Sequence, residues 1–190
     1  MSAEGVPWPR KTNLFTIGHS THPLEKFVAL LGQHGIEVVA DIRRFPGSRK
    51  FPQFNQDELV FALQKVDIDY HWLEALGGRR GKRQNHSSSI NLGLHNASFR
   101  NYADYMLTKE FDEGMTRLLD LARCQPTTLM CAEALFWRCH RRLVSDFLVA
   151  NGVTVQHIMA NGDLQPHSVT LGAVIKDGGV TYPAERSLFN

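Results

Sequence analysis

Short apolar runs alternate with segments of helical pattern along most of this chain, and no other feature constrains the fold as strongly. The apolar runs have the length of strands and occupy residues 13–17, 36–40, 69–73, 127–131 and 153–159. Four segments between these runs have apolar residues at helical spacing. The first follows Pro23, the second covers 56–66, the third covers about 99–123, and the fourth extends from the fourth apolar run to about residue 150. Strand–helix–strand repeats form right-handed crossovers in a parallel sheet. The sequence therefore predicts one α/β domain of three layers, with a mostly parallel sheet of about five strands and helices on both faces.

Three segments do not follow this alternation. Residues 1–12 are expected to form an extended N-terminal segment, and residues 77–98 a long basic loop rich in Gly, Ser and Asn. Residues 160–190 are expected to form an irregular tail with a hairpin around 173–175 and 180–182. All of them belong to the single domain 1–190, because 190 residues can build one substantial core.

The composition is that of a globular protein, with 43% hydrophobic and 21% charged residues. No apolar run reaches the length of a membrane span, and the N-terminus lacks the apolar stretch of a signal peptide. Three cysteines do not make a disulfide framework. We therefore expect a cytoplasmic protein with no membrane partner, and its oligomeric state stays open. The net charge of +2 is compatible with a phosphate-bearing partner.

Each of the first four predicted strands runs into a polar cluster. The clusters are residues 18–20, 41–44, 74–78 and 131–133. Ligands of parallel sheets bind beyond the carboxyl ends of the strands, so we expect the four clusters to converge on one rim.

The second cluster opens a basic loop, "DIRRFPGSRKFPQFN", in which Arg43, Arg44, Arg49 and Lys50 are interleaved with phenylalanines. Guanidinium groups bind phosphate and aromatic rings stack on bases, although the same composition fits a solvated loop that its phenylalanines anchor. Asp41 can orient an arginine, act as a base or cap the loop. In the first cluster, ligand binding by His19 is favoured over a nucleophilic Ser20, because no G-x-S-x-G motif surrounds the serine.

The stretch "LMCAEALFWRCHRR" holds Cys131 and Cys139. Their spacing matches neither zinc motifs nor the Cys-x5-Arg cradle of phosphatases. We therefore predict no metal and no cofactor. An open alternative is that both cysteines cluster with His140, with Glu133 completing a catalytic site. A thiolate nucleophile is a further alternative, and a small buried side chain fits Cys131 better. Glu133, followed by Phe136 and Trp137, is expected to be partly desolvated, which would raise its pKa toward that of a general base. The competing interpretation is a carboxylate at a helix N-terminus.

Several motifs together resemble those of the domain of unknown function 488 family. They are "TIGHS", "DIRRFPGSRKFPQFN", "YHWLEALGG", "NYADYM", "LMCAEALFWRCHR" and "VQHI", in order from Thr16 to Ile158. The resemblance implies a fold and a set of marked positions, but no reaction. These positions are His19, Ser20, Asp41, Arg43, Pro46, Ser48, Tyr70, Gly77, Gly78, Cys131, Glu133, Cys139, His140 and Arg141. "ALFW" departs from the polar, often proline-containing spacer of the family, and Ile42 replaces the usual valine.

These patterns predict a hydrolytic enzyme that acts on a nucleic acid or a nucleotide, including removal or repair of a modified base in DNA. The predicted catalytic residues are Glu133, Asp41 and His19. The predicted substrate-binding residues are Ser20, Arg43, Arg44, Ser48, Phe54, Tyr70, Gly77, Gly78, Arg79, Trp137, Cys139, His140 and Arg141. The expected partner is a nucleic acid or a phosphorylated small molecule. The alternatives are a non-catalytic nucleic-acid or nucleotide-binding module and a cysteine-dependent sulfur-transfer or redox enzyme.

Overall fold

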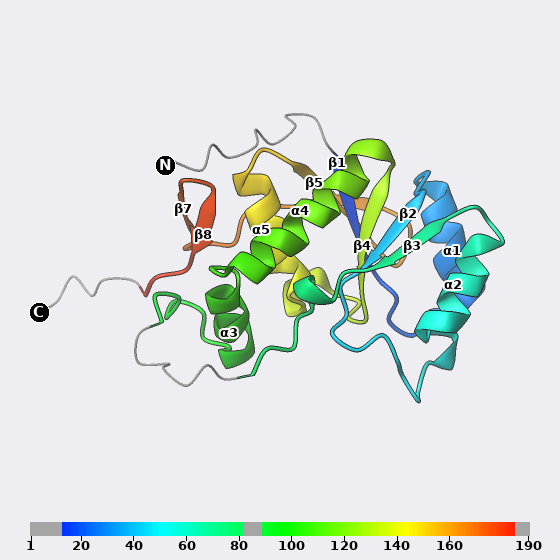
Figure 1. Cartoon of the computed structure of the whole chain (residues 1–190), viewed down its shortest axis with the longest axis horizontal. Helices are drawn as coiled ribbons and strands as arrows, with labels where there is room; N and C mark the ends of the chain where they lie inside the picture. The colour runs from blue at the N-terminus through cyan, green and yellow to red at the C-terminus, as the bar shows by residue number, and fades with distance from the viewer. Residues whose placement is uncertain (1–12, 82–88, 185–190) are drawn as a thin grey trace, which may run out of the picture.

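A six-stranded sheet forms the centre of the molecule in a computed structural model that describes residues 13–81 and 89–184 (Figure 1). Its strands are β1 (Asn13–Gly18), β2 (Val38–Asp41), β3 (Asp69–Trp72), β4 (Thr127–Cys131), β5 (Thr154–Ile158) and β6 (Leu164–Pro166). The order across the sheet is β3-β2-β4-β1-β5-β6. The first five strands are parallel, and β6 pairs antiparallel with β5.

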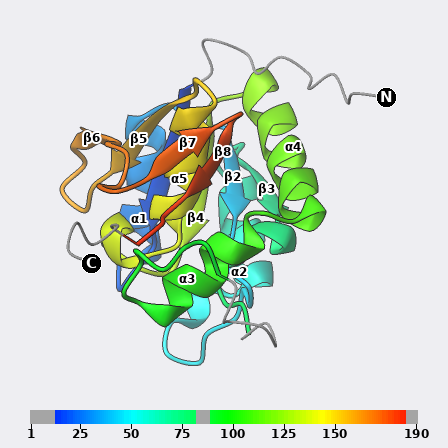
Figure 2. The ribbon, with the colours of Figure 1, turned by 90° about the vertical axis from the view of Figure 1, so that its left-hand side faces the viewer.

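Helices cover both faces of this sheet. They are α1 (Leu24–Gln33), α2 (Gln56–Gln64), α3 (Ala97–Tyr105), α4 (Lys109–Cys124) and α5 (Arg141–Ala150). Figures 1 and 2 show α1 and α2 on one side of the sheet and α4 and α5 on the other. Along β4, Met130 packs into the cluster under α1 and α2, whereas Leu129 and Cys131 pack into the cluster under α4 and α5. This period-2 alternation separates the two apolar cores.

The predicted three-layer α/β architecture is confirmed, with one strand more than expected. The additional strand is β6, whose register places Gln165 opposite His157. A separate antiparallel pair, β7 (Val174–Lys176) and β8 (Gly179–Thr181), lies where a hairpin was expected. It is attached to the body by Val180 and Tyr182, both buried in the core under α5.

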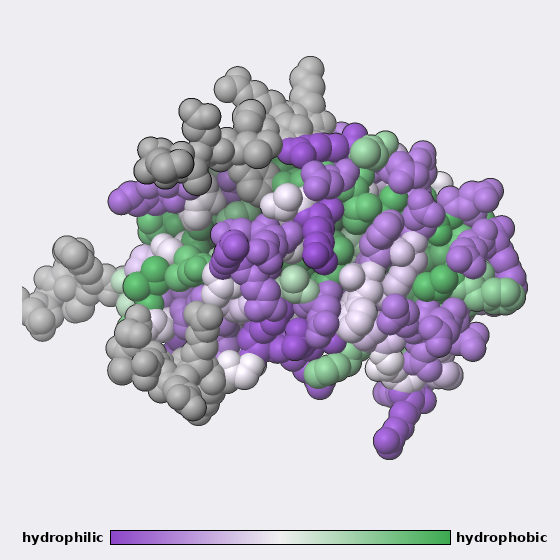
Figure 3. Space-filling model, in the orientation of Figure 1, coloured by the Kyte–Doolittle hydropathy of each residue, from purple (hydrophilic) through white to green (hydrophobic). Residues whose placement is uncertain are grey.

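The helical pattern over 99–123 is divided between α3 and α4. Thr108 separates them, because its hydroxyl accepts a hydrogen bond from the N–H of Phe111 and so caps α4. The buried side of α4 carries Phe111, Met115 and Leu118. In Figure 3 the outer surface over α4 is largely hydrophilic, which is the distribution expected for an amphipathic helix. Among the described residues, no helix combines the length and the apolar character needed to cross a membrane.

The helix after β4 begins later than predicted. Residues 132–140 form a loop with a short 3-10 turn at Phe136–Arg138, and α5 begins only at Arg141. The Arg141 guanidinium donates to the carbonyls of Glu133 and Ala134, which therefore face a side chain instead of a helical N–H. The predicted N-terminal segment 1–12 lies outside the described residues, as do Lys82 and Arg83 of the long loop. The long loop ends where α3 begins, at Ala97.

Candidate functional site

The polar clusters after β1, β2 and β4 meet at one edge of the sheet, as their place in parallel strands predicts, and the cluster after β3 contributes Gly78. The chain continues beside β4 after β1 has ended, since the N–H of His19 donates to Cys131 (2.9 Å) and that of Ser20 to Ala132 (3.0 Å). A pocket of about 650 Å³ lies at this edge. It is lined by His19, Ser20, Thr21, Arg43, Arg44, Phe45, Gly47, Ser48, Lys50, Phe51, Gly78, Arg79, Ser98, Phe99, Cys131, Ala132, Glu133, Ala134, Arg138, Cys139 and His140.

Most of the predicted site residues line this pocket. They are His19, Ser20, Arg43, Arg44, Ser48, Gly78, Arg79, Glu133, Cys139 and His140. The predicted residues outside the lining are Asp41, Phe54, Tyr70, Gly77, Trp137 and Arg141. The structure assigns several of this second group to the support of the pocket wall.

Asp41 lies behind the wall and holds Arg43. Its buried carboxylate accepts hydrogen bonds from the backbone N–H and the guanidinium of Arg43, and from the hydroxyl of Tyr70 at 2.7 Å. Burial and the Asp41 charge raise the pKa of Tyr70, so its hydroxyl remains a donor. Phe54 completes this support, since its carbonyl accepts from Arg43 at 2.8 Å. Because these donors occupy the carboxylate oxygens of Asp41, its contacts favour the orientation of Arg43 over the role of a base.

His19 is a neutral wall residue. Its ring is buried and stacks on Phe54 with centroids 4.2 Å apart. The Nε2 atom lies 3.3 Å from Arg43 Nη1, which can only donate, so Nε2 accepts and Nδ1 carries the proton that contacts the Ser20 carbonyl at 3.1 Å. Burial, followed by the charge of Arg43, lowers the pKa of His19 to about 4. Both nitrogens are thus engaged, which favours positioning over proton transfer.

Ser20 has a φ of 47°, in the left-handed region that non-glycine residues rarely occupy. Such backbone conformations are concentrated at functional sites. The half-buried Ser20 lines the pocket directly after His19, so the turn that ends β1 directs this residue into the site.

Glu133 is exposed, which differs from the partial desolvation expected of it. The aromatic residues after it do not cover its carboxylate: Phe136 stacks on His157 with centroids 3.5 Å apart, and Trp137 is 42% exposed. The Glu133 carbonyl lies against Gly18, where a Cβ atom would overlap it. Glu133 supplies the only carboxylate among the described residues that line the pocket.

Arg141 faces the interior, although it was predicted to bind the substrate. Its side chain is 1% exposed and donates to the hydroxyl of Thr16 at 3.2 Å as well as to the carbonyls after β4. The guanidinium therefore clamps the loop 132–134 onto β1. Gly77 has a packing role too, because a Cβ atom there would press on the backbone of Arg44.

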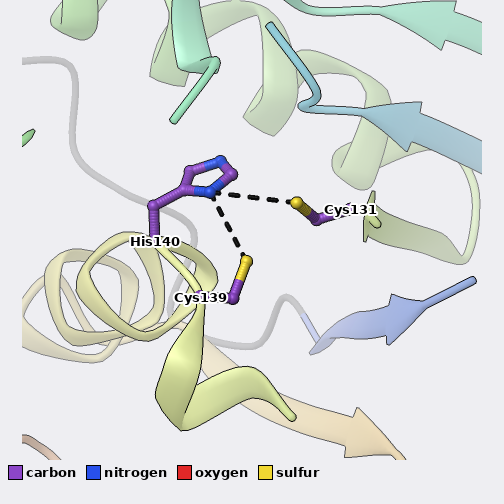
Figure 4. A group of neighbouring side chains, drawn as sticks. All are labelled: Cys131, Cys139 and His140. Atoms are coloured by element: carbon purple, nitrogen blue, oxygen red, sulfur yellow. Dashed lines mark hydrogen bonds between the residues drawn. The ribbon is translucent and has the colours of Figure 1, made fainter. Parts of the chain in front are cut away.

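Cys131, Cys139 and His140 form a buried cluster (Figure 4), and all three residues line the pocket. The His140 Nδ1 atom lies 3.4 Å from the sulfur of Cys139 and 3.9 Å from that of Cys131. The hydrogen bond to Cys139, together with burial, raises the pKa of Cys131 well above its usual range. Burial opposes ionisation of Cys139, but the hydrogen bond from Cys131 and the contact with His140 outweigh it, so the pKa of Cys139 lies well below its usual range. Such a cluster was one of the alternatives that the sequence left open, although the spacing of the three residues matches no zinc motif.

Cations dominate the pocket. Five positively charged side chains line it, those of Arg43, Arg44, Lys50, Arg79 and Arg138. Arg43 is paired with Asp41 and Arg44 with Glu74, whereas the other three have no ion pair within the described part of the chain. This arrangement can bind an anion, and a phosphate is the common biological anion that guanidinium groups prefer.

Sequence reasoning did not assign some of the lining residues to the site. Phe45, Lys50 and Phe51 belong to the basic loop, whose composition was the available signal. The loop is shaped by Asn55, whose side chain accepts from the N–H of Ser48, and by Ser48, whose hydroxyl accepts from the N–H of Phe51. Thr21, Ser98, Phe99 and Arg138 also line the pocket, and no local pattern links these residues to it.

The fold and this site define an α/β domain with a basic, cysteine-containing pocket at the carboxyl ends of its parallel strands. The chain belongs to the family described as domain of unknown function DUF488, whose model matches residues 23–148. The match covers α1 to most of α5 and begins just after His19 and Ser20. Comparison with curated proteins and with solved structures gave no match.

Proposed function

We propose that this protein is a hydrolytic enzyme that acts on a nucleic acid or a nucleotide, with removal or repair of a modified base as its reaction class. The observation that carries this proposal is the charge of the pocket: five cations and, among the described lining residues, one carboxylate. A substrate with phosphate groups matches the cations. The carboxylate supplies the group that hydrolysis requires.

The phosphate groups would be bound by the cations that protrude into the pocket. Lys50, Arg79 and Arg138 are exposed and have no ion pair within the described residues, so phosphate can bind them without displacing a protein carboxylate. The Asp41–Arg43 pair serves as a fixed support, because each nitrogen of its guanidinium already donates to a protein acceptor.

A base would stack on the aromatic side chains at the pocket. Phe45 is 66% exposed, and Phe51 and Phe99 are half-buried, so their rings are accessible on one side. Stacking of this kind tolerates different bases. If the target lies within a duplex, it must leave the stack before it can enter a pocket of this size.

Glu133 would act as the general base for the attacking water. A carboxylate can accept a proton from water and release it to the leaving group, which gives it both roles in hydrolysis. Its position at the mouth of the pocket, on the loop that Arg141 clamps, places it on a fixed backbone. Asp41 and His19 support the wall and are positioning residues in this scheme.

Replacement of Glu133 tests the proposal. Oligonucleotides that carry modified bases are screened for base release, and the Glu133→Gln variant is compared with the wild type on the best substrate. We expect turnover to fall by about 10²-fold or more, since general-base catalysis contributes that much, whereas affinity stays within about twofold because Gln keeps the shape of Glu. Glu113→Gln, on the exposed side of α4, is the matched control and should behave as the wild type.

Two results would overturn parts of this proposal. Full activity in Glu133→Gln would exclude Glu133 as the base. Tight binding without turnover of any substrate would replace the enzyme by a non-catalytic binding module.

A further inference from the structure

We infer that Cys131, Cys139 and His140 form a binding site for a thiophilic divalent metal ion, with Zn²⁺ as the best match. This inference goes beyond the proposed function, because it concerns the binding of a metal and does not depend on the substrate. It also replaces the sequence-based expectation that the chain holds no metal, which was based on spacing alone.

The distances between the three donor atoms fit zinc. In a tetrahedral site with Zn–S bonds of about 2.3 Å and Zn–N bonds of about 2.05 Å, sulfur and nitrogen ligands lie about 3.6 Å apart. The two sulfurs lie 3.4 and 3.9 Å from His140 Nδ1, and all three donor atoms lie within 4.8 Å of one another. An ion can therefore bind with only small side-chain movements.

The imidazole is already oriented for a ligand. The Nε2 atom of His140 lies 3.1 Å from the carbonyl of Ile42, to which it can only donate, so Nδ1 carries the lone pair. Figure 4 shows this Nδ1 edge facing both sulfurs. Donation of the second ring N–H to a backbone carbonyl is the usual support of a metal-bound histidine. Gly78 packs against the ring, and the ring of Tyr102 makes an edge contact with it at a centroid distance of 5.0 Å, which keeps the imidazole in place.

The surroundings suit thiolate ligands. The backbone N–H of Arg141 lies 3.5 Å from the Cys139 sulfur and donates to it. The Arg141 guanidinium is buried without a carboxylate partner among the described residues, so a nearby negative charge is favoured. Two thiolates and one neutral imidazole are a donor set that selects zinc over magnesium or calcium, which prefer oxygen.

The site has three protein ligands and adjoins the pocket. Within the described chain, the cluster contains no fourth Cys, His, Asp or Glu donor, and all three ligands line the 650 Å³ pocket. Structural zinc sites close the sphere with four protein ligands, whereas catalytic sites leave one position for water or substrate. The geometry therefore points to a metal that is accessible from the pocket.

The experiment measures metal in the untagged full chain. The protein is loaded with Zn²⁺, desalted and analysed for bound zinc, and a parallel sample is titrated with Co²⁺. We expect about one zinc per chain, and cobalt spectra with a thiolate charge-transfer band and the strong visible bands of tetrahedral coordination. The variants Cys131→Ser, Cys139→Ser and His140→Asn should each lose most of the zinc. Cys124→Ser is the matched control, since Cys124 is exposed and does not belong to the cluster.

The cobalt spectrum of the wild type decides the question even if a variant fails to fold. A second measurement on the wild type is the alkylation of its thiols, in which bound zinc should protect Cys131 and Cys139 but leave Cys124 reactive. The inference is overturned if the wild type binds no stoichiometric metal, if the cobalt spectrum lacks thiolate bands, or if Cys131→Ser and Cys139→Ser retain the metal of the wild type. A disulfide between Cys131 and Cys139 under non-oxidising conditions would overturn it as well, in favour of a redox pair.

Discussion

Two glycines allow chain segments to approach closely around the site. A Cβ atom at Gly18 would overlap the Glu133 carbonyl, and one at Gly78 would overlap the His140 imidazole. Neither glycine is among the residues with positive φ, so the reason for glycine is lack of space and not backbone conformation. The "LGG" motif, predicted to touch the substrate, therefore also sets the position of the histidine.

The substitution Gly78→Ala should destabilise the protein. The added methyl must displace the ring of His140, and overpacking of this kind costs about 1–3 kcal/mol. Urea unfolding measures the change. Gly81→Ala, three residues along the same loop, is the control, because a Cβ atom there meets no described residue within 4 Å. Equal stability of the two variants would show that His140 can move freely away from Gly78.

At the scale of secondary-structure elements, a buried chain of hydrogen bonds joins α5, β5 and β1. Asp146 of α5 accepts from His167 Nε2 at 2.8 Å, and His167 Nδ1 lies 2.9 Å from His157 of β5. The other nitrogen of His157 lies 2.7 Å from the hydroxyl of Thr16, which also accepts from Arg141. Asp146 further accepts from the hydroxyl of Tyr182. The network thus attaches the segment after β6 to the sheet. Through Thr16 it extends to Arg141, which holds the loop 132–134 against β1.

This network makes stability sensitive to acid. Burial is the main cause that lowers the pKa of His157 to about 3 from its ordinary 6.5, followed by the charges of His167 and Arg141. Asp146 is hydrogen-bonded to His167 and is linked to His157 only through that ring. Below about pH 6.5, His157 binds a proton in the unfolded state but stays neutral in the native state. The free energy of unfolding therefore has its full value above pH 6.5 and declines as the pH falls toward 3. The slope for this residue is at most about 1.4 kcal/mol per pH unit.

Urea unfolding between pH 6.5 and 5, above the range in which most carboxylates titrate, measures this slope. His157→Gln removes the titrating ring and should give a shallower pH dependence than the wild type. His95→Gln, at an exposed position, should leave the dependence unchanged. A parallel decline in all three proteins would exclude His157 as the source.

At the scale of the whole molecule, the pocket combines segments that lie far apart in the sequence. The ends of β1 and β4 form its floor, the basic loop after β2 and Gly78–Arg79 form its sides, and α3 adds Ser98 and Phe99. Its cations are therefore concentrated around one pocket, although the net charge of the chain is only +2.

This concentration of charge predicts salt-dependent binding of a polyanion. The affinity for a single-stranded oligonucleotide should fall linearly with salt on a double logarithmic plot, with a slope of about −0.7 per phosphate neutralised. Arg79→Ala and Lys50→Ala should each weaken binding and reduce the magnitude of the slope by the contribution of about one phosphate contact. Arg123→Ala, on the last turn of α4 beside Asp120, is the control. A slope near zero would exclude a phosphate-bearing partner.

The alternation of apolar runs was sufficient to predict the layers, the parallel sheet and the edge at which polar clusters meet. These features depend on local periodicity and on a general property of parallel sheets, so a single sequence contains them. The additional strand β6 and the late start of α5 were not predicted, because they depend on pairing with β5 and on the carbonyl contacts of Arg141.

The amino-acid sequence by itself thus determined the architecture, the family and most of the charged residues that line the site. Only the tertiary structure decided what these residues do: Arg141 became a clamp, Asp41 a support for Arg43, and Cys131, Cys139 and His140 a cluster. The physical reason is that a side chain's direction depends on its partners. Thr16 and Arg141 are 125 positions apart, and Ile42 and His140 are 98, so no local pattern records that they meet.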